Sequence, residues 1–101
     1  MVTSFDLQIW ENAVNSINES GKTDLIWEEW SALTVLNGCL SSDNFQGDES
    51  HRSIRLLKDN LSRHSNNPVL QIHLQSFINL CEKYFVKQAT SPTGVSSIMK
   101  E

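Results

Sequence analysis

The longest and most apolar run of the chain, Asn67 to Gln88, has a helical pattern. Five of its larger side chains recur at steps of four, three, four and three: Leu70, Leu74, Phe77, Cys81 and Tyr84. That spacing places all five along one stripe of an α-helix. Asn67 is a favourable N-cap, and Pro68 suits the first helical position, where its missing N–H costs nothing. The pattern predicts a central helix over residues 68–87.

Two further amphipathic segments come earlier in the chain. Residues 4–20 predict a helix capped by Ser4, with an apolar stripe made of Leu7, Trp10, Ala13, Val14 and Ile17. Residues 24–37 predict a second helix, with a stripe made of Leu25, Ile26, Trp30, Leu33 and Leu36. Gly21 and Gly38 follow these segments, and each glycine is expected to end its helix.

The remaining segments differ in composition. Residues 39–47 are rich in turn-forming side chains and predict a loop, which Leu40 and Phe45 anchor to the core. Residues 49–64 predict a helix after Asp48, with a short stripe of Ile54, Leu57 and Leu61 that His64 extends. Pro92, Gly94 and several Ser and Thr residues make 89–101 a predicted flexible tail.

Together these segments predict an all-α, single-domain, four-helix bundle-like fold over residues 1–88, followed by the flexible tail. A length of 101 residues favours one domain. Because short connections favour antiparallel neighbours, the first and second helices are expected to pair, as are the third and fourth.

Charge is distributed unevenly along the chain. The formal net charge is −4, but residues 1–49 carry −8 and residues 50–101 carry +4. The predicted pairing would therefore dock an acidic helix pair onto a basic one. Such asymmetry bears on partners and self-association more than on the fold.

Compartment and membrane association follow from what the sequence lacks. The first ten residues have no basic segment followed by an apolar run, so they do not form a signal peptide. No window approaches the roughly 18 consecutive apolar residues of a membrane span. Cys39 and Cys81 are interpreted as free thiols, and the cytoplasm is the expected location.

No motif predicts catalysis or metal binding, so we expect no enzyme activity and no cofactor. The candidate ligands show none of the spacings of zinc sites, and the histidines are expected to be partly exposed: Cys39, His51, His64, His73 and Cys81. His73 and Cys81 would lie about 12 Å apart along one helix, too far for a catalytic dyad. Glu29 is the one charge that projects inward on its helix, and we interpret it as half solvated near the helix N-terminus.

Two binding functions remain. Arg52, Arg55, Lys58 and Arg63 lie along the third predicted helix and could contact nucleic-acid phosphates, although the acidic net charge opposes this alternative. The preferred prediction is a small non-catalytic protein-interaction module, acting as an adaptor, regulator or inhibitor, that forms a homodimer or a binary complex with another protein. Its expected interface residues are Val69, Ile72 and Val86 on the outer face of the central helix, together with Trp27.

Overall fold

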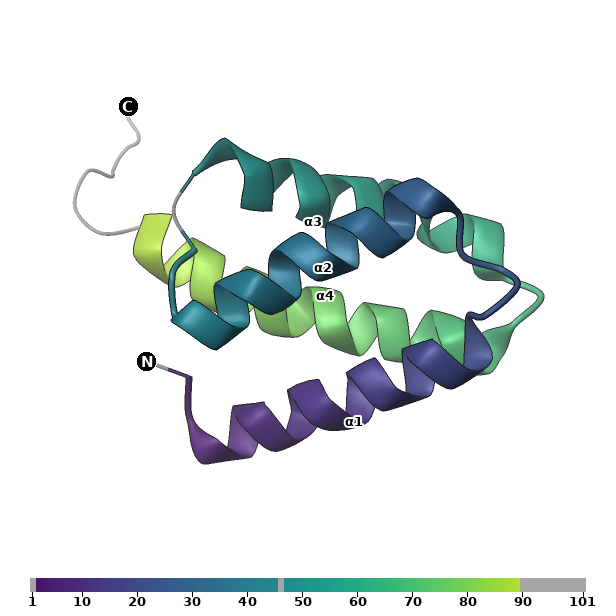
Figure 1. The fold of residues 1–101 in the computed structure, drawn as a ribbon, viewed down its shortest axis with the longest axis horizontal. Coiled ribbons are helices and arrows are strands. Elements are labelled where there is room, and N and C mark those ends of the chain that lie inside the picture. Colours follow the sequence, from purple (N-terminus) through teal and green to yellow (C-terminus); the bar gives the residue numbers. More distant parts are fainter. Residues whose placement is uncertain (1, 46, 90–101) are drawn as a thin grey trace, which may run out of the picture.

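Four α-helices and one short 3₁₀ helix form the protein in its computed structural model, which describes residues 2–45 and 47–89 (Figure 1). The helices are α1 (Ser4–Ser20), α2 (Trp27–Ser42), α3 (Asp48–Asn60) and α4 (Pro68–Ala89), and η1 (Leu61–His64) directly follows α3. The predicted all-α, four-helix arrangement is therefore confirmed. The predicted tail falls, apart from Ala89, on residues 90–101, which lie outside the described residues.

The centre of the fold is α4, as its sequence pattern predicts. All five side chains of the predicted stripe are buried, and so are two side chains beside it: Leu70, Leu74, Phe77, Ile78, Leu80, Cys81 and Tyr84. α4 runs between α1 and the pair formed by α2 and α3 (Figure 1). Because its buried surface is wide, α4 contacts α1 on one side and α3 with η1 on the other.

Asn67 connects the start of α4 to the end of α1. Its Oδ1 accepts a hydrogen bond from the backbone N–H of Leu70 at 3.3 Å, as expected for an N-cap. Its Nδ2 donates to the carbonyl oxygen of Ser20 at 2.9 Å and to Oδ2 of Asp24 at 2.6 Å. One side chain therefore caps α4 and fixes the position of the chain that leaves α1.

The helices pair differently from the prediction. α1 packs mainly against α4 and α2 mainly against α3, whereas α1 and α2 are not a closely packed pair. The expected pairing of the first two helices is therefore wrong, and the expected contact between α3 and α4 is confirmed. Each acidic helix packs against a helix from the basic half of the chain, so the two halves do not form separate charged layers.

The connection between α1 and α2 explains this difference. It spans residues 21–26, longer than predicted, because Leu25 leaves the helical pattern and is buried in the core. Gly21 ends α1 as predicted, but it does so with φ −101°, which is not the left-handed conformation. A Cβ at this position would lie 2.8 Å from Leu25 Cδ1 and 2.9 Å from the carbonyl oxygen of Ile17. Glycine at 21 therefore permits the close approach of Leu25 that directs the chain away from α1.

The boundaries of α2 also differ from the predicted range of 24–37. The helix starts at Trp27 and continues through Gly38 to Ser42. A glycine inside a helix costs only about 0.5–1 kcal/mol, and the continued helix buries Leu40. Asp43, with φ 55°, then ends it in the left-handed conformation. The predicted loop is thus shorter than expected, and Phe45 is buried in it as predicted.

Candidate functional site

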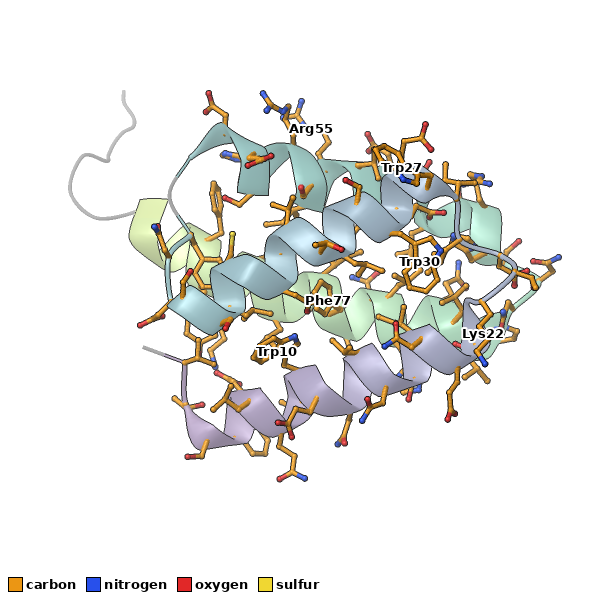
Figure 2. All side chains as sticks on the ribbon, in the orientation of Figure 1. Trp10, Lys22, Trp27, Trp30, Arg55 and Phe77 are labelled. Atoms are coloured by element: carbon orange, nitrogen blue, oxygen red, sulfur yellow. The ribbon has the colours of Figure 1, made fainter. Side chains whose placement is uncertain are left out.

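A groove lies between α1 and α2, because α1 packs on α4, α2 packs on α3, and the two helices do not pack closely on each other. Its two hollows, of about 400 Å³ and 110 Å³, share Val14 and Asn37. Trp10 lines the larger hollow and Trp30 the smaller one. Figure 2 shows the two indoles in the space between α1 and α2, with Phe77 of α4 between them. Side chains from both helices therefore line one continuous surface, which we call the α1–α2 groove.

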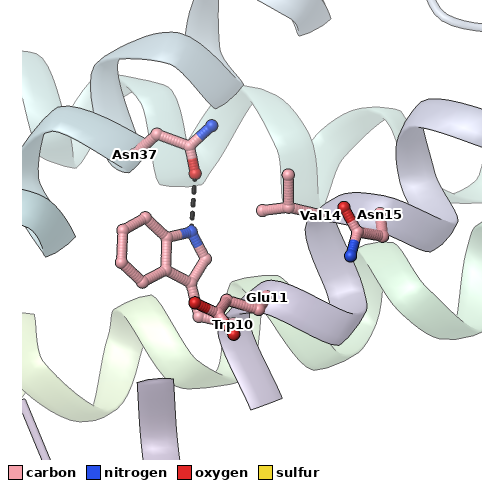
Figure 3. Close-up of a pocket in the computed structure, with 5 residues that line it drawn as sticks. All are labelled: Trp10, Glu11, Val14, Asn15 and Asn37. Atoms are coloured by element: carbon pink, nitrogen blue, oxygen red, sulfur yellow. Dashed lines mark hydrogen bonds between the residues drawn. The ribbon is translucent and has the colours of Figure 1, made fainter. Parts of the chain in front are cut away.

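The Trp10 side chain forms a hydrogen bond across this groove. Its indole N–H donates to Oδ1 of Asn37 at 2.7 Å, which joins α1 to α2 (Figure 3). Trp10 and Val14 are half-buried. The hydrogen bond fixes the orientation of the Trp10 ring and leaves the larger hollow beside it, bounded by Val14, Asn15 and Glu11.

The rest of the groove combines an apolar floor with an uncharged polar rim. Ile17 and Leu33 are buried at its base. Asn18 and Thr34 are exposed at its edge, and the Thr34 hydroxyl donates to the carbonyl oxygen of Trp30 at 3.0 Å. An apolar base with a few polar groups around it is typical of binding sites for apolar side chains.

Both walls of the groove lack basic residues. The α1 helix contains Asp6, Glu11 and Glu19, the α2 helix contains Glu28 and Glu29, and neither contains Lys or Arg. Asp6 and Glu29 are buried and bonded within the fold. Glu11 lines the larger hollow directly. The electrostatic potential at the groove is therefore expected to favour cations.

Glu29 is fully buried, so its interpretation as a half-solvated group is wrong. Its Oε1 accepts the backbone N–H of Ile26 at 2.9 Å and lies 3.4 Å from Arg63 Nη1. Its Oε2 lies 2.7 Å from Nε2 of His64, which is buried rather than partly exposed as expected. The carboxylate is thus paired with donors from the N-cap of α2 and from η1, and it connects α2 to η1 inside the core.

A second buried carboxylate, Asp6, connects α1 to α4. Thr3, and not Ser4, caps α1: its Oγ1 accepts the backbone N–H of Asp6 at 3.1 Å. The Asp6 Oδ2 accepts hydrogen bonds from Lys83 Nζ at 2.8 Å and from the Tyr84 hydroxyl. These donors, Lys83 first, hold the pKa of Asp6 below its usual value, and Asp6 in turn raises the pKa of Lys83. This cluster holds one end of the α1–α4 pair together.

The four basic side chains predicted to bind nucleic acid do not form one free cationic face. Lys58 Nζ lies 2.7 Å from Oε2 of Glu82, and Arg63 contacts the buried Glu29. Arg52 and Arg55 are exposed and have no ion pair within the described residues. Two of the four side chains predicted to contact nucleic acid, those of Lys58 and Arg63, are therefore already paired with acidic residues within the fold.

The predicted protein-interface residues lie on two different parts of the surface. Val69 and Ile72 are exposed on the first turns of α4, as expected. Trp27 is 77% exposed and instead lines a hollow between α2 and α3. The side chain of Val86 lies outside the described part of the chain. The sequence pattern does not indicate the α1–α2 groove, because it places both tryptophans in core stripes; the signal for the groove is that an indole N–H usually needs a partner when it is buried.

Cys81 is buried in the core, and burial raises the pKa of its thiol far above the usual range. Such a thiol is a poor nucleophile, in agreement with the place of Cys81 in the predicted apolar stripe of the central helix. Cys39 and Cys81 are free thiols. Among residues 2–45 and 47–89, no group of three or more His, Cys, Asp or Glu side chains is placed to hold a metal ion.

Comparison of the chain with protein-family models, curated proteins and solved structures found no match. No helix in the described ranges combines the length and apolarity needed to cross a membrane. The surface of the molecule itself is therefore the basis for inferring function.

Proposed function

We propose that the protein is a small, non-catalytic protein-interaction module that binds a basic amphipathic helix of a partner protein in the α1–α2 groove. The observation that supports this proposal most directly is the separation of α1 and α2, which leaves two half-buried tryptophans beside hollows that no side chain of the described residues fills. Grooves between helices commonly bind amphipathic helices through apolar side chains spaced three or four residues apart.

The charge of the groove indicates the chemistry of the partner. Glu11 of α1 lines the larger hollow, and neither hollow is lined by a Lys or Arg of the described residues. A partner helix with an apolar face and flanking Lys or Arg residues would place its cations near Glu11 while its apolar side chains enter the hollows. An acidic helix would instead be repelled, so the groove discriminates between partners as well as attracting one.

This proposal is tested with synthetic helical peptides and the intact protein. One peptide has a leucine face and a lysine-rich polar face, a second has glutamate in place of lysine, and a third keeps the lysines but scrambles the leucine spacing. We expect only the first peptide to bind, with chemical-shift changes at the indole N–H groups of Trp10 and Trp30. Equal binding of the scrambled peptide, or shifts confined to other surfaces, would contradict the proposal.

Variants distinguish groove binding from general attraction to an acidic protein. Val14→Glu adds a negative charge, so non-specific attraction of the lysine-rich peptide should increase. If the apolar groove is the site, affinity should instead fall by about tenfold or more, since a charged group would enter the hydrophobic contact. Val69→Glu on exposed α4 is the matched control. Asn15→Phe, which fills the larger hollow from an exposed position, is a second blocking variant in case Val14→Glu weakens the fold.

Nucleic-acid binding through α3 is a second proposal, supported by Arg52 and Arg55, which are exposed and form no ion pair with the residues that the structure describes. Such binding should weaken steeply with salt and in the Arg52→Glu, Arg55→Glu double variant. Electrophoretic mobility shifts with duplex and single-stranded probes at low salt measure it. The absence of any shift would refute this second function.

A further inference from the structure

Trp27 is the most exposed large apolar side chain among the described residues, with 77% of its surface accessible. Its indole N–H has no hydrogen-bond partner in the described part of the chain, in contrast to the N–H of Trp10, which is bonded to Asn37. Figure 2 shows Trp27 beside α3, on the other side of α2 from Trp10. Tryptophan is enriched among the residues that dominate protein–protein binding energy.

A hollow of about 320 Å³ lies next to this side chain, between α2 and α3. Trp27 stands at its edge, and its apolar wall is made by Ala32, Val35 and Leu56. A protruding aromatic ring therefore lies beside a concave apolar surface on the same molecule. A two-fold axis turns such a combination into a self-complementary interface, because each copy supplies both the ring and the hollow.

The charges around the hollow indicate what kind of partner fits it. Glu28 and Glu49 lie on its rim together with Arg52. A partner that carried only positive or only negative side chains would leave one of these groups facing a like charge. A second copy of this chain carries the same two signs, so Arg52 of each copy can face the acidic groups of the other.

We propose that the surface formed by Trp27, Glu28, Glu49, Arg52 and Leu56 is the interface of a two-fold symmetric homodimer, in which the Trp27 ring of each copy enters the α2–α3 hollow of the other. This surface does not include the α1–α2 groove, so the dimer and the binding of a partner helix succeed or fail independently. This interface shares Trp27 with the interface predicted from the sequence. The other predicted residues, Val69, Ile72 and Val86, belong to α4 and are not part of it.

The first test measures the mass of the full chain by sedimentation and light scattering from micromolar to millimolar concentration. We expect a reversible monomer–dimer equilibrium that Trp27→Ala weakens by roughly 30-fold or more, the effect of removing a dominant interface residue. Phe5→Ala is the matched control, because Phe5 is 75% exposed on α1 and lies outside this surface. A monomeric wild type at every concentration, or loss of the dimer in Phe5→Ala or Ile72→Glu but not in Trp27→Ala, would overturn the proposal.

The second test exchanges the charges. Arg52→Glu makes the rim entirely acidic, and Glu28→Arg combined with Glu49→Arg makes it entirely basic, so each variant alone should be monomeric. Mixed together, the two variants should form a heterodimer, and circular dichroism of each variant checks that it remains folded. Failure of the mixture to associate, with both variants folded, would exclude the pairing of Arg52 with the acidic rim.

Discussion

Replacing Glu29 should destabilise the protein more than replacing any exposed acidic residue. The carboxylate is fully buried and accepts hydrogen bonds from the Ile26 N–H at 2.9 Å and from His64 at 2.7 Å. A buried donor left without an acceptor costs about 1–3 kcal/mol, so the two donors that Glu29→Ala leaves unpaired should cost about 2–6 kcal/mol together. Glu29→Ala should lose stability of that size, a large part of the 5–15 kcal/mol that is typical of a small domain.

Arg63 should contribute little to this loss. Its side chain is 45% exposed, and its Nη1 lies 3.4 Å from the carboxylate. Exposed pairs of this kind are worth about 0–1 kcal/mol. Glu29→Gln keeps the shape of the side chain and one carbonyl acceptor, so we expect it to lose about 1–3 kcal/mol, the contribution of hydrogen bonds to a charged group.

The measurement is urea-induced unfolding followed by tryptophan fluorescence, with Glu28→Ala and Glu28→Gln as controls. Glu28 precedes Glu29 in α2 but is exposed, so its variants should change the free energy of unfolding by less than about 0.5 kcal/mol. The slope of unfolding free energy against denaturant should stay the same. If Glu29→Ala were as stable as Glu28→Ala, or if Glu29→Ala and His64→Ala were additive in the double variant, the buried pair would not stabilise the fold as argued.

Three other predictions concern acid stability, thiol reactivity and the glycines. Because the pKa of Asp6 is lowered in the folded state, its stabilising contribution should be present at neutral pH and should disappear as pH falls below about 4 through the folded value. In urea unfolding, Asp6→Asn should therefore be less stable than wild type at pH 7, and the difference should shrink as the pH is lowered; a constant difference would contradict this. A maleimide reagent, with the products identified by mass spectrometry, should label only Cys39 in the native protein and both cysteines in urea. Labelling of both cysteines in buffer without urea would contradict the burial of Cys81. Gly21→Ala should lower the free energy of unfolding by about 1–3 kcal/mol through overpacking. Gly38→Ala has open space at Cβ and should raise it by about 0.5–1 kcal/mol. Equal thermal midpoints of the two variants would refute both expectations.

The central helix could be predicted from the sequence because its signals are local. Asn67 and Pro68 mark its start, and the five stripe residues have one spacing that suits only a helix. All five are buried. The end of α2 differs from the prediction for a related reason: Gly38 is a local stop signal, but the burial of Leu40 in the following turn outweighs the small cost of a glycine inside a helix.

The candidate site could not be predicted in the same way, because it depends on contacts between distant segments. The partner of Glu29 is His64, 35 residues away, so the helical pattern around Glu29 does not indicate that it is buried in a bonded cluster. Trp10 and Trp30 fit apolar stripes, and whether they face the core or a groove depends on how far α1 lies from α2. That distance depends on the connection between α1 and α2. Leu25 is buried in this connection, whereas the sequence pattern places it inside a helix.

The pairing of α1 with α4 also implies an order of assembly during synthesis. Asp6 and Lys83, which bond these helices, are 77 residues apart in the chain. α2 and α3, by contrast, are neighbours in sequence and can pair as soon as both have left the ribosome. Contacts between distant segments form slowly, because a long loop must close before they are made. We therefore expect α1 to leave the ribosome first and to find its place last, when α4 has emerged.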